Sequence, residues 1–228
     1  MKNLHLIILS CFVLQTANAS TIFTDNFNSY SGGNFNGGQY QSDLVVAYGG
    51  NEANWTHTGG NAIHAVDLAN IYGSTSNPSN FAAMIWQDNT LTLNSGIAGS
   101  NVLGQTYQVD FQASAAVYQA SSQATSATDG LMIEILRSDN SILDSFIYLP
   151  GAWTGNMAFN SAEFSYTGDG VDGNIRIEIA SAEPNSGRFA GAIDNLSVST
   201  VPEPASIALI AIGCLGFAAT HRKTIKYI

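Results

Sequence analysis

The sequence predicts an all-β domain, an antiparallel β-sandwich of the jelly-roll type. Apolar and polar residues alternate with a period of two, most regularly in residues 107–113, 131–135 and 175–179. This alternation is typical of strands that bury one face. Clusters of Gly, Asn, Asp and Ser separate such runs, and no helical repeat of useful length occurs before residue 205. Roughly ten strands without intervening helices indicate a sandwich rather than an α/β fold.

The first 19 residues have the three parts of a secretory signal peptide. Lys2 gives a positive start, residues 4–13 are mostly apolar, and Ala17-Asn18-Ala19 forms a cleavage site of small residues before Ser20. We therefore expect export across the inner membrane. The expected order is a signal peptide at 1–19, a jelly-roll domain at 20–200 and a C-terminal segment at 201–228.

The remaining strands are predicted from shorter apolar runs. In the run of residues 107–113, Gln108, Asp110 and Gln112 form the polar face. In the run of residues 189–198, the residues expected to face inward have odd numbers before Asp194-Asn195 and even numbers after it. Such a shift by one residue predicts a β-bulge there. Polar segments at 29–42, 49–54, 73–80 and 121–130 are predicted to be exposed loops. The further expected strands are 44–48, 62–66, 81–87, 142–149, 157–166 and 189–198.

The charge of the domain is strongly acidic. The chain has 17 acidic and 7 basic residues, and between residues 20 and 200 only Arg137, Arg176 and Arg188 are basic. Such a domain repels a polyanion, so nucleic-acid binding is excluded. Both cysteines, Cys11 and Cys214, fall outside the domain, so no disulfide is available to it. An exported fold without disulfides makes a structural metal worth seeking.

The C-terminal segment combines a proline motif, an apolar run and a basic end. Pro202-Glu203-Pro204 must end the preceding fold, because each proline lacks an amide donor. Residues 205–219 contain no charge. As a helix they would be about 22 Å long, which spans a hydrocarbon core of about 30 Å only marginally. The basic residues Arg222 and Lys223 would remain in the cytoplasm by the positive-inside rule.

This C-terminal arrangement resembles the PEP-CTERM sorting signal of Gram-negative bacteria. The resemblance implies that an exosortase-type membrane protease reads the tripeptide at 202–204 and cuts near it. It further implies transient anchoring by the C-terminal helix, followed by release or transfer to the cell surface. A permanent single-pass anchor is the alternative.

Two terminal stretches of the domain carry a second resemblance. Residues 22–27 and 191–198 look like the opening and closing strands of carbohydrate-binding-module and concanavalin-like jelly rolls. In several such modules an aspartate of the closing strand holds a structural calcium together with groups of the first strand. The resemblance therefore implies a calcium ion between Asp25 and Asp194, with backbone carbonyls completing the oxygen shell.

A search for catalytic motifs favours a protein that is not an enzyme. His57 and His64 are the only histidines of the domain and cannot form a zinc cluster without cysteines. Glu134 and Glu178 fit outward-facing strand positions better than a catalytic pair. The Asp-Gly repeats at 169–173 lack the ligand spacing of an EF-hand and predict a hairpin turn.

Aromatic residues provide the better evidence for a ligand. Trp153 lies between Pro and Gly residues, and Tyr72 and Trp55 lie in polar surroundings. An aromatic face can stack on a sugar ring, and the alternative for Trp153 is that it caps one end of the hydrophobic core. We expect an exported, non-enzymatic surface or matrix protein that binds extracellular polysaccharide. The alternatives are a structural or adhesive matrix protein without a sugar site, and a secreted polysaccharide hydrolase or lyase.

Overall fold

The chain divides into two units, Ser20–Val201 and a second unit of Met1–Ala19 with Pro202–Ile228. Of the second unit, only residues 19 and 202 are described. The computed structural model describes residues 19–27, 30–31, 34–37, 45–48, 51–52, 54–58, 64–67, 81–116, 125–152, 154, 158–183 and 187–202.

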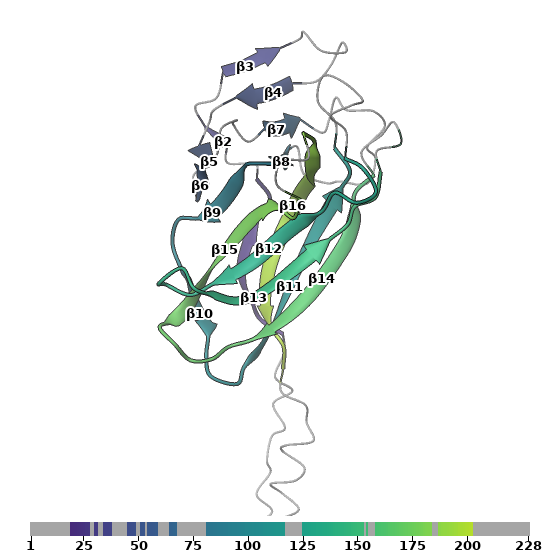
Figure 1. Ribbon diagram of the computed structural model, residues 1–228. Helices are drawn as coiled ribbons and strands as arrows, with labels where there is room; N and C mark the ends of the chain where they lie inside the picture. Colours follow the sequence, from purple (N-terminus) through teal and green to yellow (C-terminus); the bar gives the residue numbers. More distant parts are fainter. Residues whose placement is uncertain are drawn as a thin grey trace, which may run out of the picture. The chain divides into compact units, whose positions relative to one another are not determined.

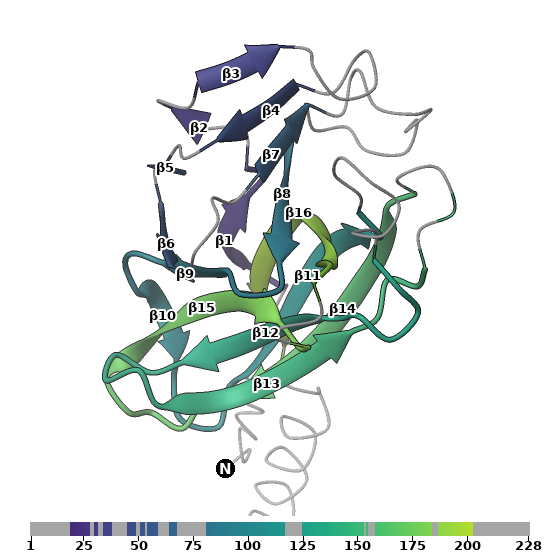
Figure 2. The same cartoon turned by 45° about the horizontal axis from the view of Figure 1, so that its top comes forward.

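Two antiparallel sheets form the unit Ser20–Val201, and Figures 1 and 2 show them as facing layers. The eight-stranded sheet has the order β14-β11-β16-β8-β7-β4-β3, and β1 also pairs with β16. Its strands are β1 (Thr21–Asp25), β3 (Asn34–Gly37), β4 (Val45–Tyr48), β7 (His64–Asp67), β8 (Phe81–Trp86), β11 (Thr106–Ser114), β14 (Asn160–Thr167) and β16 (Phe189–Thr200).

The six-stranded sheet has the order β13-β12-β15-β9-β6, and β10 also pairs with β15. Its strands are β6 (Trp55–Thr58), β9 (Thr90–Leu93), β10 (Ile97–Asn101), β12 (Leu131–Leu136), β13 (Ile142–Tyr148) and β15 (Gly173–Ser181). A short additional ladder joins β2 (Tyr30–Ser31) and β5 (Asn51–Glu52). The prediction of an all-β antiparallel sandwich is confirmed.

The core lies between the two sheets and consists of the residues that the period of two predicted to face inward. It includes Tyr107, Val109, Phe111, Ala113, Ile133, Ile135, Ile175, Ile177 and Ile179. Full burial of one such aliphatic or aromatic side chain stabilises the fold by about 1.5–3 kcal/mol. At the edge, Phe146 of β13 stacks on Phe164 of β14 with ring centroids 4.9 Å apart. Side chains of both sheets therefore close the sandwich.

Several strands were missed because their sequences are short and polar. Strands β6, β9 and β10 were not predicted, and β2, β3 and β5 fall inside segments that were predicted to be loops. Residues 55–58 read Trp-Thr-His-Thr, which is too short to show a period. These residues form a strand because β6 pairs with β9 along four positions. Tertiary pairing outweighs the weak local propensity.

The hairpin predicted at residues 169–173 is wrong. Strand β14 pairs with β11 in one sheet, whereas β15 pairs with β12, β9 and β10 in the other. The connection therefore crosses from sheet to sheet. Gly170 and Gly173 do have positive φ angles of 77° and 70°, as a tight turn requires. The local sequence predicts the turn but cannot predict which sheet accepts the next strand.

Candidate functional site

Strand β16 of the eight-stranded sheet contains a β-bulge where it pairs with β11. Asp110 pairs with Ser197 and Gln112 pairs with Asp194, so that Asn195 and Leu196 both lie opposite Phe111. The bulge predicted at Asp194-Asn195 is thus confirmed. Asn195 has a φ of 49°, a left-handed conformation that asparagine tolerates better than most residues.

At the bulge, the side chains of Asn195 and Leu196 have different surroundings. Leu196 is fully buried in the core, whereas Asn195 is partly exposed. The side-chain amide of Asn195 donates a hydrogen bond to Gln112 Oε1 over 2.9 Å. Gln112 belongs to the polar face predicted from the alternation in β11. The bulge therefore places an amide among the outward residues of the neighbouring strand.

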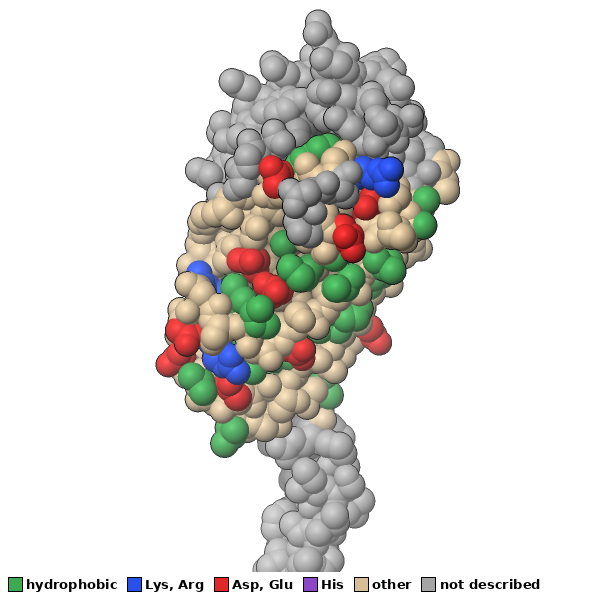
Figure 3. Space-filling view, viewed as in Figure 1, with side chains coloured by type: hydrophobic (Ala, Val, Ile, Leu, Met, Phe, Trp, Pro, Cys, Tyr) green, Lys and Arg blue, Asp and Glu red, His purple; other side chains and the backbone are tan. Residues whose placement is uncertain are grey.

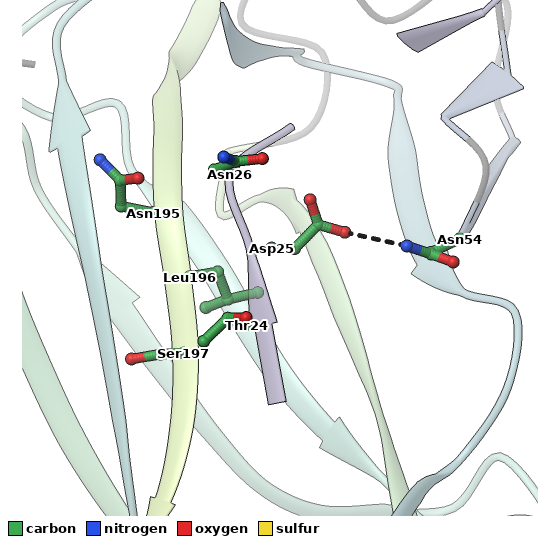
Figure 4. Close-up of a pocket in the computed structure, with 7 residues that line it drawn as sticks. All are labelled: Thr24, Asp25, Asn26, Asn54, Asn195, Leu196 and Ser197. Carbon is green, nitrogen blue, oxygen red and sulfur yellow. Dashed lines mark hydrogen bonds between the residues drawn. The ribbon is translucent and has the colours of Figure 1, made fainter. Parts of the chain in front are cut away.

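Two pockets share Asn195, and we call them together the Asn195 site. The first has a volume of about 440 Å³, and Figure 4 shows its lining residues. The second has a volume of about 480 Å³. Most of the described side chains that line them carry an amide, a hydroxyl or a carboxylate, and none of these described side chains is basic. The first pocket is lined by Thr24, Asp25, Asn26, Asn54, Asn195, Leu196 and Ser197, and the second by Asp110, Phe111, Gln112, Ser161, Ala162, Glu163 and Asn195.

A pair of carboxylates lies in the second pocket. Asp110 of β11 is directly opposite Glu163 of β14. Like charges at opposed positions destabilise a sheet. The side-chain amide of Gln108 donates to Glu163 Oε2 over 2.6 Å and to Asp110 Oδ1 over 3.3 Å. Gln108 thereby bridges the two carboxylates, whose remaining lone pairs can accept hydrogen bonds from hydroxyl groups.

Asp25 lies at the inner side of the first pocket and is only 7% exposed. Its Oδ1 accepts the backbone N–H of Phe27 over 2.8 Å, and its Oδ2 accepts the indole N–H of Trp55 over 2.9 Å. The amide of Asn54 also points toward Oδ2, at 3.5 Å (Figure 4). We call this group the Asp25 network. It ties the end of β1 to the start of β6.

The interpretation of Trp55 as a sugar-stacking residue needs correction. Trp55 is 2% exposed, belongs to the core and packs against Phe27 with ring centroids 5.6 Å apart. Because Asp25 accepts its indole N–H inside the domain, the ring can be buried without an unsatisfied donor. Its polar sequence neighbours gave no indication of this partner, which lies 30 residues earlier in the chain.

The described residues do not fit a calcium site at Asp25. Strand β1 does pair with β16, and Asp25 lies opposite Leu196, close in sequence to Asp194. Both oxygens of Asp25 already accept N–H groups, however, and Asp194 Oδ1 accepts the N–H of Asn195 over 2.7 Å. Asp194 is fully buried and lines neither pocket. Among the described residues, no group of three or more His, Cys, Asp or Glu could hold a metal ion.

Several predicted functional residues lie outside the described part of the chain. They are Trp153, Tyr72, Glu203, Pro204, Arg222 and Lys223. Pro202 is described and follows the end of β16. The predicted apolar helix at 205–219 is also outside the described residues, and within them no helix is long and apolar enough to cross a membrane.

Glu134 and Glu178 lie directly opposite each other on β12 and β15. They alternate with the core residues Ile133, Ile135, Ile177 and Ile179, so they lie on the face away from the core, as the sequence indicated. Partial burial, with a smaller contribution from Glu178, raises the pKa of Glu134. The hydroxyl of Thr92 donates to Glu178 over 2.8 Å.

A second aspartate network ties three connections together at the far end of β11 from the bulge. Asp169 Oδ2 forms a salt bridge with Arg137 Nε at 2.7 Å. Asp169 Oδ1 accepts Asn101 Nδ2 over 2.8 Å and the N–H of Val171 over 3.0 Å. The Val171 N–H, then Arg137 and Asn101, lower the pKa of Asp169 to about 2. We call this group the Asp169 network.

Comparison with known proteins supports the two parts of the chain separately. The model of the PEP-CTERM protein-sorting motif matches residues 200–223. No curated protein is significantly similar in sequence. Among solved structures, an apo cyclase from Fischerella sp. is 13% identical with a TM-score of 0.53, covering 82% of this chain and 99% of its own.

Two carbohydrate-binding modules are matched at lower TM-scores. The module TmCBM61, solved with β-1,4-galactotriose, is 16% identical with a TM-score of 0.43, covering 66% of this chain and 90% of its own. The xylan-binding CBM22-1 domain of Paenibacillus barcinonensis Xyn10C is 8% identical with a TM-score of 0.43, covering 82% and 97%. The likeness to the cyclase, at 13% identity, concerns the fold alone. The chain therefore carries a PEP-CTERM sorting motif at its C-terminus, following a two-sheet β-sandwich.

Proposed function

We propose that the protein is an exported, non-enzymatic surface or matrix component whose sandwich domain binds extracellular polysaccharide at the Asn195 site. The observation that carries the proposal is the pair of polar pockets that share Asn195. Sorting through the PEP-CTERM motif would bring this site to the cell surface or release it.

The chemistry of the lining matches a hydroxyl-rich ligand. A sugar hydroxyl both donates and accepts, and the site offers amide donors at Asn54, Gln112 and Asn195 beside carboxylate acceptors at Asp110 and Glu163. A hydrogen bond contributes about 0.5–1.5 kcal/mol net, and about 1.5–3 kcal/mol when one partner is charged. Several such bonds are enough for a weak binding module. Carboxylates without a basic residue favour a neutral polysaccharide over an acidic one.

Aromatic stacking remains a separate prediction. Trp153 and Tyr72 were singled out from the sequence, and nothing in the described residues tests their role. If Trp153 contributes a stacking face, Trp153→Ala should weaken polysaccharide binding and leave the melting temperature near that of the parent. If it caps the core instead, the same change should cost about 3–5 kcal/mol.

Affinity electrophoresis of the mature protein against neutral and acidic polysaccharides tests the proposal. Asn195→Gly removes the amide while tolerating the φ of 49°, and Glu163→Gln removes one charge. Both variants should lose the retardation that neutral polysaccharide causes. Glu178→Gln, on the outer face of the other sheet, is the matched control and should keep it. A parent protein that no polysaccharide retards would support the structural or adhesive alternative.

The sorting step has its own test. If a protease of the exosortase type processes the chain near Pro202-Glu203-Pro204, the form found outside the inner membrane should lack the basic end. Mass spectrometry of that form decides the matter. A peptide containing Arg222 or Lys223 from the surface protein would support the permanent anchor.

A further inference from the structure

Exposed apolar side chains gather at the end of the sandwich where the chain leaves toward Pro202. Leu103 and Val102, between β10 and β11, are 76% and 54% exposed. Val171, between β14 and β15, and Ile142, at the start of β13, are also exposed. We call these four residues the exit-end patch. Figure 3 shows hydrophobic side chains at the lower end of the described surface, where β10 lies in Figure 1.

Hydrogen bonds hold the connections of the patch together. The N–H of Gly104 donates to the carbonyl of Gly168 over 2.8 Å, and the N–H of Gly168 donates to the carbonyl of Gln105 over 2.9 Å. A Cβ on Gly168 would lie 2.3 Å from the carbonyl oxygen of Val102, so only glycine permits this approach. The Val102–Leu103 connection and the β14–β15 connection therefore form one surface.

The Asp169 network adds Ile142 to this surface. Arg137 Nη1 donates to the carbonyl of Ile142 over 2.8 Å while its Nε pairs with Asp169. The apolar side chains thus project from backbone that polar contacts hold in place. Leucine and valine exposed on such connections contribute little to the core, which makes them candidates for contact with another surface.

The last residue of the compact unit lies beside this patch. The side-chain amide of Gln105 donates to the carbonyl of Val201 over 2.8 Å, and the N–H of Val201 donates to the carbonyl of Thr106 over 2.9 Å. The apolar run predicted to enter the membrane begins at residue 205. Four residues reach at most about 14 Å when fully extended. The exit end must therefore lie close to a membrane that holds this run.

We propose that the exit-end patch rests on the lipid surface while the C-terminal run is inserted in the membrane. The proposal depends on the predicted insertion of residues 205–219 and is independent of polysaccharide binding. Leu103 and its apolar neighbours enter the boundary between headgroups and acyl chains. Asp139 and Asp172 flank the patch, and Arg137 is paired with Asp169, so the surface suits zwitterionic rather than anionic headgroups. This contact keeps residues 202–204 near the membrane surface.

Depth-dependent quenching in vesicles tests the proposal with the full-length chain. In a Cys11→Ser, Cys214→Ser background without other cysteines, Leu103→Cys is labelled with an environment-sensitive fluorophore and reconstituted into phosphatidylcholine vesicles that contain a doxyl-lipid quencher. Thr128→Cys is the control. Thr128 lies in the connection between β11 and β12, where the N–H of Thr125 donates to the carbonyl of Ala116. Ala116 follows the end of β11 that is opposite to the exit-end patch. A label on the natural Cys214, in a Cys11→Ser chain that is otherwise unchanged, reports insertion of the apolar run.

The expected result is a blue shift and quenching at position 103 and neither at position 128. Adding Val102→Ser and Val171→Ser should reduce the quenching at 103 without lowering the melting temperature, because both side chains are exposed. Equal behaviour of positions 103 and 128 overturns the proposal, whether or not the label at 214 is quenched. A blue shift that follows protein concentration and not the quencher also overturns it, and indicates a second copy of the chain.

Discussion

The Asp25 and Asp169 networks use the same device in opposite surroundings. Each carboxylate accepts three donors from the described part of the chain and so ties segments distant in sequence onto the sandwich. Asp25 is 7% exposed, and its donors among the described residues are neutral N–H groups. The side chain of Asp169 is 30% exposed, and one of its donors is the cation Arg137. The ion pair is thus found where water already screens the charge.

This difference indicates that burial, and not the presence of a salt bridge, decides how much each network stabilises the fold. Removing a buried acceptor leaves N–H groups without a partner, at a cost of about 1–3 kcal/mol for each group. At a partly exposed site water replaces the lost partner, and an ion pair contributes about 0–1 kcal/mol. The following predictions test this ranking.

The largest effect is expected for Asp25→Ala. It should lower the free energy of unfolding by about 3–5 kcal/mol, because the N–H groups of Phe27 and Trp55 lose their acceptor inside the domain. Urea unfolding measures the loss. Asp169→Ala is the matched control and should cost clearly less. Equal costs for the two variants would contradict the ranking by burial.

A smaller effect isolates the bond between Asp25 and the indole of Trp55. In a double-mutant cycle of Asp25→Ala and Trp55→Phe, the coupling energy should be about 1–3 kcal/mol, since the phenylalanine ring keeps most of the apolar contact but has no donor. The four proteins are compared by urea unfolding under one condition. Additive costs would show that the 2.9 Å contact contributes nothing of its own.

The Asp169 network should act through pH. The pKa of Asp169 is lowered to about 2 in the folded protein, from the ordinary value of 3.8. Its contribution to stability is therefore complete above about pH 4 and is lost as the pH falls from there toward 2. Asp169→Asn should lower the urea midpoint at pH 7, and the difference from the parent should shrink over that window.

A companion variant separates the causes of this pKa shift. The backbone N–H of Val171 is the largest cause and Arg137 comes after it. Arg137→Gln should therefore bring the pKa of Asp169 closer to 3.8 and narrow the pH range over which the contribution of Asp169 is lost, without abolishing that loss. If the difference in urea midpoint between the parent and Asp169→Asn stays constant from pH 7 to pH 2, the Asp169 network does not contribute to the loss of stability in acid.

The smallest expected effect concerns calcium. Because Asp25 already accepts N–H groups on both oxygens, the melting temperature of the mature domain should be the same with calcium and with a chelator. If the domain did bind calcium, a free calcium concentration one hundred times the dissociation constant would raise the free energy of unfolding by about 2.7 kcal/mol. A chelator effect that Asp194→Ala removes would establish the calcium site that the resemblance implied.

Some of the polar residues around the Asn195 site could be predicted from the sequence. The alternation in β11 identified Gln108, Asp110 and Gln112 as outward residues, and the phase change identified the bulge that carries Asn195. The sequence contained no sign that Glu163 of β14 and Asn54 lie beside these residues. Their proximity depends on which strands pair, and pairing joins segments that are far apart in the chain.

The sequence alone determined the all-β sandwich, the position of the bulge and the C-terminal sorting motif. Each of these follows from local order: a period of two, a slip in that period, and a tripeptide followed by an apolar run. Only the tertiary structure decided that Trp55 is buried against Asp25, that residues 169–173 cross between the sheets, and that two pockets meet at Asn195. These features depend on partners supplied by distant segments, and a residue's own neighbours in sequence carry no information about them.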